Sequence, residues 1–299
     1  MVEYQYLSAK EKAKYRKGLS RMVKQLKIYV LVDNTAKPSF LCEWGLSILI
    51  DADENRILLD TGSSSMFAKN AKQLGIDLAS VRFGILSHAH YDHSDGMDAF
   101  FSLNDSAPFL IREGSDENCF GLKEGSLEYI GIQKGLLSRF HDRIRYVSGI
   151  YEITDGIWLV PHRQADCSAI ARRNDLYVRN QKAYFPDRFF HEQSLVIDTS
   201  RGLIVFSSCS HTGIMSILED IRQAPGRSDI CAYVGGLHLY KLTDPELSDL
   251  CDKIEDSAIA RIFTGHCTGD HAYRFLQDRL GTRIVQFYSG YVHEFFSEV

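Results

Sequence analysis

The strongest constraint on this chain is a histidine-rich loop that follows a short apolar run at residues 81–86. Residues 85–96 read Ile-Leu-Ser-His-Ala-His-Tyr-Asp-His-Ser-Asp-Gly, and the apolar run before the loop is typical of a buried strand. Four side chains that can bind a metal ion crowd into six positions: His88, His90, Asp92 and His93. Imidazole and carboxylate donors together suit zinc or another first-row metal. The spacing predicts that His88 and His90 bind one ion while Asp92 and His93 reach a second.

Three later strands are each predicted to end near a histidine and a glycine. The histidines follow separate apolar runs: His211 after 203–207, His238 after 230–234 and His266 after 261–264. Because ligands of α/β sites collect at strand ends, we expect these three histidines to complete the metal coordination. Three further residues are candidates either to bind a metal or to orient a ligand: Asp60, His191 and Cys209. For Asp60, a turn in which the carboxylate binds its own backbone is an equally open interpretation.

The composition describes a globular chain with room for a large core. Of its 299 residues, 44% are hydrophobic, and the net charge is −5 with basic side chains interspersed among the acids. Because no basic stripe is present, nucleic acid is not an expected partner. A small-molecule substrate is expected instead. The basic run Arg172, Arg173 and Arg179 would serve an anionic substrate, or would simply form a solvated surface.

The expected compartment is the cytoplasm, with no membrane association. No apolar run approaches the roughly 20 residues that a membrane-spanning helix needs, and residues 1–27 lack an apolar signal core. The seven cysteines, an odd number without a C-x-x-C pair, argue against a disulfide framework. Most are interpreted as small buried hydrophobes, but Cys209 and Cys267 each stand near a histidine at a strand end.

The order of the expected elements predicts a single α/β domain over residues 1–299. Two hairpins, at 45–60 and 195–207, each precede an alternation of strands and helices. This duplicated pattern suggests two mixed β-sheets packed face to face with helices outside, an αββα sandwich. A lead-in helix is expected at residues 8–25. An insertion over about residues 97–183 is expected to shape the substrate pocket.

The motifs resemble those of the metallo-β-lactamase superfamily, whose signature the metal loop carries. Further motifs of this resemblance are Asp33-Asn34-Thr35, Gly45-Leu46-Ser47, Leu58-Leu59-Asp60-Thr61-Gly62, Glu192-Gln193-Ser194-Leu195, Cys209-Ser210-His211-Thr212-Gly213, Gly235-Gly236-Leu237-His238-Leu239 and His266-Cys267-Thr268-Gly269. Together they look like the branch related to 7,8-dihydropterin-6-methyl-4-(β-D-ribofuranosyl)aminobenzene-5′-phosphate synthase, over roughly residues 27–287. The chain departs from this branch at Trp44, where histidine is common, and at His191, where an acidic residue is common. Many superfamily members bridge two metals with an Asp, and Cys209 or a neighbour stands at that position.

The resemblance implies an enzyme with two metal ions, zinc first and manganese or iron as alternatives. The expected reaction is hydrolysis of an ester or phosphodiester by a metal-activated water, with Asp92 as both ligand and proton acceptor. Histidine rather than Glu at position 90 favours redox-inert zinc chemistry over a di-iron site. Two alternatives stay open: a pterin-forming transferase with a diphosphate leaving group, and a non-catalytic metal-dependent binding or sensor protein.

Overall fold

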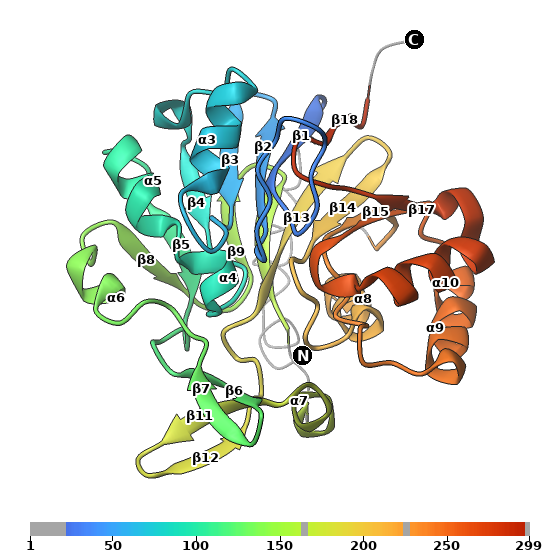
Figure 1. The fold of residues 1–299 in the computed structure, drawn as a ribbon. Helices are drawn as coiled ribbons and strands as arrows, with labels where there is room; N and C mark the ends of the chain where they lie inside the picture. The colour runs from blue at the N-terminus through green and yellow to red at the C-terminus, as the bar shows by residue number, and fades with distance from the viewer. Residues whose placement is uncertain (1–21, 163–166, 224–227, 297–299) are drawn as a thin grey trace, which may run out of the picture.

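Two β-sheets pack face to face at the centre of the molecule, with helices on the outer face of each (Figure 1). This computed structural model describes residues 22–162, 167–223 and 228–296. Each sheet contains both parallel and antiparallel pairs. The prediction of an αββα sandwich with mixed sheets is confirmed.

The first sheet comes from the N-terminal half of the chain and one C-terminal strand. Its seven strands within the described ranges are, in spatial order, β18 (Val292–Glu294), β1 (Leu26–Val32), β2 (Ser47–Ala52), β3 (Asn55–Leu59), β4 (Phe83–Ile85), β5 (Phe109–Arg112) and β8 (Ile144–Val147). The antiparallel β2–β3 hairpin is the one predicted at residues 45–60. From β3 onward the strands are parallel, so their carboxyl ends share one edge. The metal loop leaves the sheet at this edge.

The second sheet comes mainly from the C-terminal half. Within the same described ranges its seven strands are β17 (Ile284–Gln286), β16 (Arg261–Thr264), β15 (Ile230–Val234), β14 (Gly202–Phe206), β13 (Gln193–Thr199), β10 (Ile157–Pro161) and β9 (Tyr151–Thr154). The β13–β14 hairpin is antiparallel, as predicted, and β14 to β17 are parallel. Parallel strands again bring several strand-end loops to one edge.

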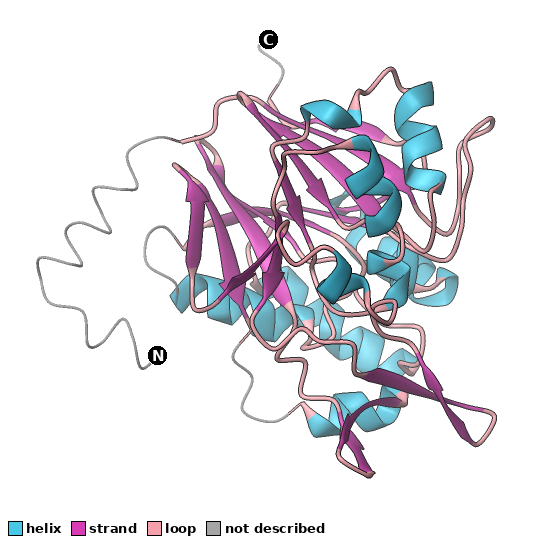
Figure 2. Ribbon diagram, turned by 90° about the vertical axis from the view of Figure 1, so that its left-hand side faces the viewer, coloured by secondary structure: helices cyan, strands magenta, loops and turns pink. Residues whose placement is uncertain are grey.

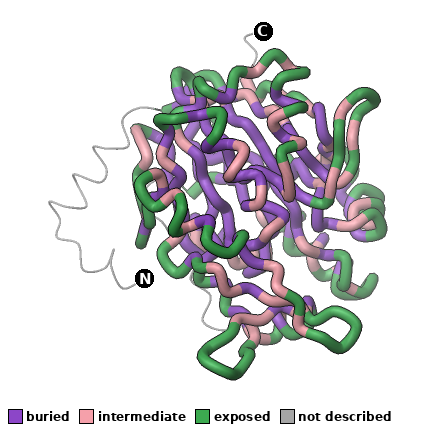
Figure 3. The backbone as a smooth tube through the Cα atoms, turned by 60° about the vertical axis from the view of Figure 1, so that its left-hand side comes forward, coloured by how far each residue is buried: buried purple, intermediate pink, exposed green. Residues whose placement is uncertain are grey.

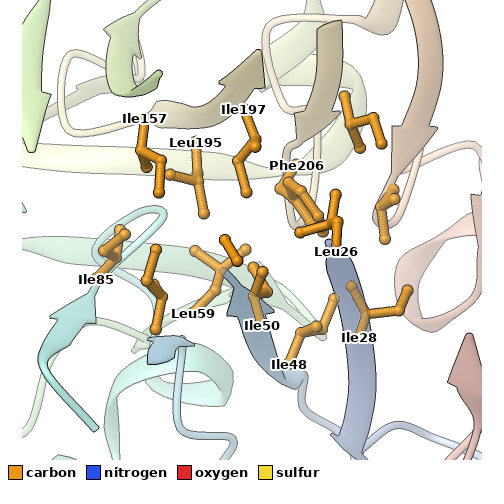
Figure 4. Close-up of a cluster of buried hydrophobic side chains, with 14 of the residues drawn as sticks. Leu26, Ile28, Ile48, Ile50, Leu59, Ile85, Ile157, Leu195, Ile197 and Phe206 are labelled. Atoms are coloured by element: carbon orange, nitrogen blue, oxygen red, sulfur yellow. The ribbon is translucent and has the colours of Figure 1, made fainter. Parts of the chain in front are cut away.

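The core between the sheets is built from aliphatic side chains at alternate strand positions (Figure 4). In β1, Leu26 and Ile28 face the second sheet, whereas Leu31 faces the outer helices. The outer layers contain α3 (Met66–Gln73) and α5 (Met97–Leu103) on the first sheet, and α8 (Ile214–Gln223), α9 (Asp244–Asp256) and α10 (Asp270–Leu280) on the second. Of the helices in the described ranges, none is long and apolar enough to cross a membrane. Burial on both faces makes each sheet a rigid base for its edge loops.

A four-stranded sheet projects from one end of the sandwich (Figure 2). Its described strands are β12 (Ala183–Pro186), β11 (Leu176–Asn180), β6 (Cys119–Lys123) and β7 (Ser126–Tyr129), next to α7 (Ser168–Asn174), whereas α6 (Leu136–Arg139) packs with the outer cluster of the first sheet. Its outer turns are exposed, in contrast to the buried strands of the sandwich (Figure 3). The insertion predicted at residues 97–183 is therefore only partly separate from the sandwich, because its strands β5 and β8 belong to the first sheet and β9 and β10 to the second.

The predicted lead-in helix, 8–25, lies mostly outside the described residues. Its last four residues, 22–25, are described and are not helical. Val23 instead forms an isolated parallel bridge with Thr199, and its N–H donates to the Asp198 carbonyl at 2.8 Å. The helix prediction is wrong for these four residues because pairing with the second sheet overrides local propensity.

Candidate metal centre

The predicted metal loop lies at the edge where the parallel strands of both sheets end. The loop follows β4, and its second part forms the short helix α4 (Tyr91–Ser94). All four of its candidate ligands are buried: His88, His90, Asp92 and His93. The loops after β14 and β16 bring His211 and His266 against it. Two groups of possible ligands result.

The first group joins the start of the metal loop to the loop after β14. Ligand atoms of His88, Cys209 and His211 all lie within 4.8 Å of one another, and the Nε2 atoms of His88 and His211 are 3.2 Å apart. The His90 ring lies beside both, with centroid distances of 4.6 Å to His88 and 4.8 Å to His211. The buried Nε2 of His90 has no hydrogen-bond partner among the described residues. These four side chains suit one tetrahedral ion.

The second group joins α4 to the loop after β16. Ligand atoms of His93, Cys209 and His266 all lie within 4.8 Å of one another, and the Nε2 atoms of His93 and His266 are 3.2 Å apart. The Oδ2 atom of Asp92 lies 3.4 Å from His266 Nε2 and 3.7 Å from His93 Nε2. The Cys209 thiol, 3.2 Å from His93 Nε2, is shared by both groups.

These distances fit metal ions. Two nitrogen ligands of a tetrahedral zinc ion, each about 2.0–2.1 Å from the metal, lie about 3.3 Å apart, close to the 3.2 Å observed in both groups. Burial lowers the pKa of His88 and of His211 well below the usual value, and it lowers the pKa of His90 to about 3. Neutral imidazoles keep a lone pair for a cation. The donor atoms therefore suit two first-row metal ions.

The Asp60 carboxylate orients one histidine of each group. Its Oδ2 accepts hydrogen bonds from His93 Nδ1 at 2.8 Å and from the Ser87 hydroxyl at 2.7 Å. The Ser87 hydroxyl in turn lies 2.8 Å from His88 Nδ1. With a proton on each Nδ1, both histidines present a bare Nε2 to the metal groups. The contacts of Asp60 thus favour the ligand-orienting interpretation over a simple turn.

Asp33 and Asn34 orient His266 from the loop after β1. The side-chain oxygen of Asn34 lies 3.0 Å from His266 Nδ1, and the Asn34 amide donates to the His266 carbonyl at 3.1 Å. The backbone N–H of His266 donates to Asp33 Oδ1 at 2.8 Å. In the sequence these residues stand out only as a family motif, because nothing in the spacing of a chain links position 34 to position 266.

Glu192 braces the loop that carries His211. Its carboxylate accepts the backbone N–H groups of His211 at 2.7 Å and Thr212 at 3.1 Å, and it pairs with His162 Nδ1 at 2.8 Å. Burial opposes ionisation, but His162 and the two N–H groups outweigh it and lower the pKa of Glu192. His162 is buried and bonded at both ring nitrogens, as a structural histidine should be.

His191 holds the metal loop rather than a metal. Its ligand atom lies within 4.8 Å of those of His90, Cys119 and Asp187. However, His191 Nδ1 accepts the backbone N–H of Ala89 at 3.1 Å, so the ring proton sits on Nε2 and is donated to Asp187 Oδ2 at 2.9 Å. An imidazole in this tautomer has no lone pair left at Nε2. Cys119 and Asp187 were not predicted from the sequence, because tertiary packing alone brings them beside His191.

His238 joins neither of the two groups. Its neighbours among possible ligands are Cys209 and Cys267. Its ring lies 4.3 Å from that of His211, and neither ring nitrogen has a hydrogen-bond partner among the described residues. Of the three strand-end histidines expected to complete the centre, His211 and His266 belong to the two groups, whereas His238 lies beside the thiols of Cys209 and Cys267.

Comparison with known proteins bears on both the fold and the branch. A family model described as the metallo-beta-lactamase superfamily matches residues 45–168. The chain is 28% identical over 298 residues to 7,8-dihydropterin-6-methyl-4-(beta-D-ribofuranosyl)-aminobenzene-5′-phosphate synthase of Methanocaldococcus jannaschii, covering 91% of this chain and 98% of that protein. It is also 28% identical to Tm1679, a metal-dependent hydrolase of the beta-lactamase superfamily, with a TM-score of 0.76 and coverage of 90% and 98%. The metallo-beta-lactamase fold protein YhfI from Bacillus subtilis, at 11% identity, a TM-score of 0.53 and coverage of 91% and 100%, shares the fold alone.

These similarities confirm the resemblance to the superfamily and to the synthase branch, but they correct the expected reaction. The curated relative that matches 91% of the chain is a synthase, so the prediction of an ester or phosphodiester hydrolase is wrong as the main interpretation. The physical reason lies in the motif itself. Histidine, aspartate and cysteine side chains bind a cation in the same way whether that cation acts on water or on a phosphate leaving group.

Proposed function

We propose, from the metallo-β-lactamase fold and the likeness to a pterin-forming synthase over nine tenths of the chain, that this protein is a metal-dependent transferase of the same type. It joins a 7,8-dihydropterin-6-methyl group to the amine of a 4-(β-D-ribofuranosyl)aminobenzene 5′-phosphate. The bond from the methylene carbon to a diphosphate oxygen breaks, and the bond to the arylamine nitrogen forms. Diphosphate leaves, and the amine gives up one proton.

The observation that carries this proposal is a pair of cavities, each lined by one histidine of a metal group. One cavity, of about 340 Å³, is lined by His266 and Cys267 among others. The other, of about 270 Å³, is lined by His211 and His238 among others. A hydrolase needs room for one organic substrate, whereas a synthase must hold two with their reacting atoms in contact. Two cavities at one centre suit the synthase.

The cavity at His266 suits the pterin. Its lining includes the aromatic side chains of Trp44, Tyr240 and Tyr273. Trp44 is 51% exposed and its ring lies 5.4 Å from that of His266, so a flat heteroaromatic ring can stack on it close to the second metal group. Asp270 and Gln286 complete the lining with polar side chains that match the donors and acceptors of a pterin edge.

The cavity at His211 suits the phosphorylated arylamine. Arg173 from α7 and Lys253 from α9 both line it, together with Glu246 and Asp249 from α9, and Arg173 forms an ion pair with Glu246 at 3.2 Å. Cationic side chains attract a phosphate group, and guanidinium groups can bind it through two hydrogen bonds. Apolar residues such as Ile214 and Leu239 line the same cavity and suit the benzene ring.

We assign two divalent ions to the two groups, zinc in preference to manganese or iron, because imidazole and thiol donors dominate. When bound there, such ions would neutralise the negative charge of a diphosphate leaving group. The chain itself aligns the reactants and provides Asp92 as the acceptor of the arylamine proton. Burial raises the pKa of Asp92, but His93 and His266 outweigh it and hold that pKa below the usual range, so the carboxylate is ionised.

The test is a two-substrate assay on protein reconstituted separately with Zn²⁺, Mn²⁺ or Fe²⁺. The donor is (7,8-dihydropterin-6-yl)methyl diphosphate and the acceptor is 4-(β-D-ribofuranosyl)aminobenzene 5′-phosphate. Mass spectrometry measures the joined product, and a coupled assay measures diphosphate. We expect equal amounts of both, and no diphosphate without the acceptor. Diphosphate release at the same rate without the acceptor would contradict the proposal.

A pair of variants ties this activity to the assigned cavity. Trp44→Ala should raise the KM for the pterin donor about tenfold, since stacking a base on an aromatic side chain is worth about 1–3 kcal/mol. The matched control is Tyr146→Ala, which removes an aromatic side chain that is 56% exposed and lies on β8, outside both cavities. An unchanged KM in Trp44→Ala would remove the pterin from this cavity.

A further inference from the structure

Two side chains beside the metal groups have no role in either of them. They are His238, in the loop after β15, and Cys267, in the loop after β16. Their ligand atoms and that of Cys209 all lie within 4.8 Å of one another. Two thiols and one imidazole thus converge beside the two nitrogen-rich groups, to which Cys209 also belongs.

The backbone is shaped to bring these sulfur atoms together. A Cβ atom on Gly236 would lie 2.5 Å from the Cys267 sulfur, and one on Gly235 would lie 1.9 Å from the Ser207 carbonyl oxygen. Only glycine therefore allows the loop after β15 to approach so closely. His238 itself has a φ of +50°, in the left-handed region that is unfavourable for a residue with a side chain. Such strain gathers at ligand-binding positions.

Without a bound ion, the three side chains have few hydrogen-bond partners. Cys209 and Cys267 are 3% and 1% exposed, and the Cys267 thiol donates a long hydrogen bond, of 3.7 Å, to the Cys209 carbonyl. Both ring nitrogens of His238 lack a hydrogen-bond partner among the described residues. An imidazole with a free lone pair next to two buried thiols is the donor set of a soft cation.

We propose that Cys209, His238 and Cys267 form a third binding position, for a thiophilic divalent ion such as Zn²⁺ or Cd²⁺. The thiols bind as thiolates, so binding releases their protons to solvent. This position is weaker than the other two because only His238 and Cys267 are its own, whereas each of the other groups has three side chains besides the shared Cys209. His238 lines one substrate cavity and Cys267 lines the other, so the position lies where the two cavities meet the metal groups.

The proposal concerns ion binding and does not depend on the substrates. Metal-free, fully reduced protein is titrated with Cd²⁺ under anaerobic conditions, with equilibrium dialysis for stoichiometry. The near-ultraviolet absorption of sulfur-to-cadmium charge transfer is the second readout. We expect a third equivalent that binds more weakly than the first two and adds thiolate absorption as it fills.

Two variants and a matched control decide between a third ion and hydrogen-bonded thiols. Cys267→Ala should lose the third equivalent and its absorption while keeping the first two. Cys251→Ala, which removes an equally buried thiol in α9, should behave as wild type. If Cys267→Ala fails to fold, His238→Asn replaces a partly exposed side chain and should weaken the third equivalent about tenfold or more. Two equivalents in wild type, or a third equivalent that survives in the variant that folds, would overturn the proposal.

Discussion

Replacing Asp60 by asparagine should weaken both main metal positions without removing a ligand. The carboxylate accepts the Ser87 N–H at 2.7 Å, the Ser87 hydroxyl at 2.7 Å and His93 Nδ1 at 2.8 Å. Asparagine keeps the shape and tolerates the φ of +60° at this position. However, one of its two side-chain polar atoms is an N–H donor. Placed at the Oδ2 position, that amide faces the Nδ1 proton of His93 and forces this proton to Nε2.

The same change reaches His88 through Ser87. In the wild-type protein the Ser87 hydroxyl donates to Asp60 and lies 2.8 Å from His88 Nδ1. When an amide donates to this hydroxyl instead, the hydroxyl turns its own proton toward His88, whose ring proton also moves to Nε2. Each ion then loses one imidazole lone pair. Loss of an orienting partner typically lowers metal affinity about 10- to 100-fold, which corresponds to about 1.4–2.8 kcal/mol per ion.

The assay is competition for Zn²⁺ against a chromophoric chelator of known affinity, for wild type, Asp60→Asn and a matched control. The control is Asp53→Asn, because Asp53 also has a left-handed φ, of +49°, and accepts a backbone N–H, that of Gln25, at 2.9 Å on the exposed surface. We expect the control to bind as wild type. Zn²⁺ affinities of Asp60→Asn within about twofold of wild type at both positions would show that Asp60 does not set the tautomers of His88 and His93.

Three further outcomes are expected. His90→Ala should lose metal from the first group and lose turnover, with an unchanged circular dichroism spectrum and melting temperature of the metal-free protein; a joint collapse would mark His90 as structural. Asp92→Asn should retain less than about 1% of turnover in saturating metal, because loss of a general base costs about 10²–10⁴-fold; full recovery would reduce Asp92 to a ligand. In the metal-free protein burial opposes protonation, but the Asp92 hydrogen bond outweighs it and raises the pKa of His266 from 6.5 to about 9. The stabilisation of the folded state by protonated His266 is complete below pH about 6.5 and is lost as the pH rises through about 9. The urea midpoint of unfolding, measured in chelator, should therefore fall between pH 6.5 and 9.5. The fall should be smaller in His266→Asn.

The residues of the metal loop were predictable because everything they need is local. His88, His90, Asp92 and His93 lie within six positions after one buried strand, and a strand followed by a tight turn brings such neighbours together in any packing. The two hairpins were also local, since an apolar run, a polar turn and a second apolar run specify antiparallel pairing.

Which distant residues meet this loop was decided by tertiary structure. His211 and His238 look alike in sequence, since each follows an apolar run and has a glycine nearby. Packing separates them. The backbone of His211 is held by Glu192, which places its ring beside His88, whereas the close approach of Gly236 to Cys267 places His238 beside thiols. No spacing along the chain encodes these contacts.

The sequence alone was enough to predict the sandwich, the metal loop and the strand ends near which further candidate ligands lie. These features depend on hydrophobic periodicity and on donor chemistry, which are properties of neighbouring residues. Tertiary contacts were needed to show that Asp60 orients both His88 and His93, that His191 accepts a backbone N–H, and that one cavity reaches His266 while another reaches His211. Tautomers and cavities depend on atoms brought together from distant segments, and the energy of their packing is set by the whole fold.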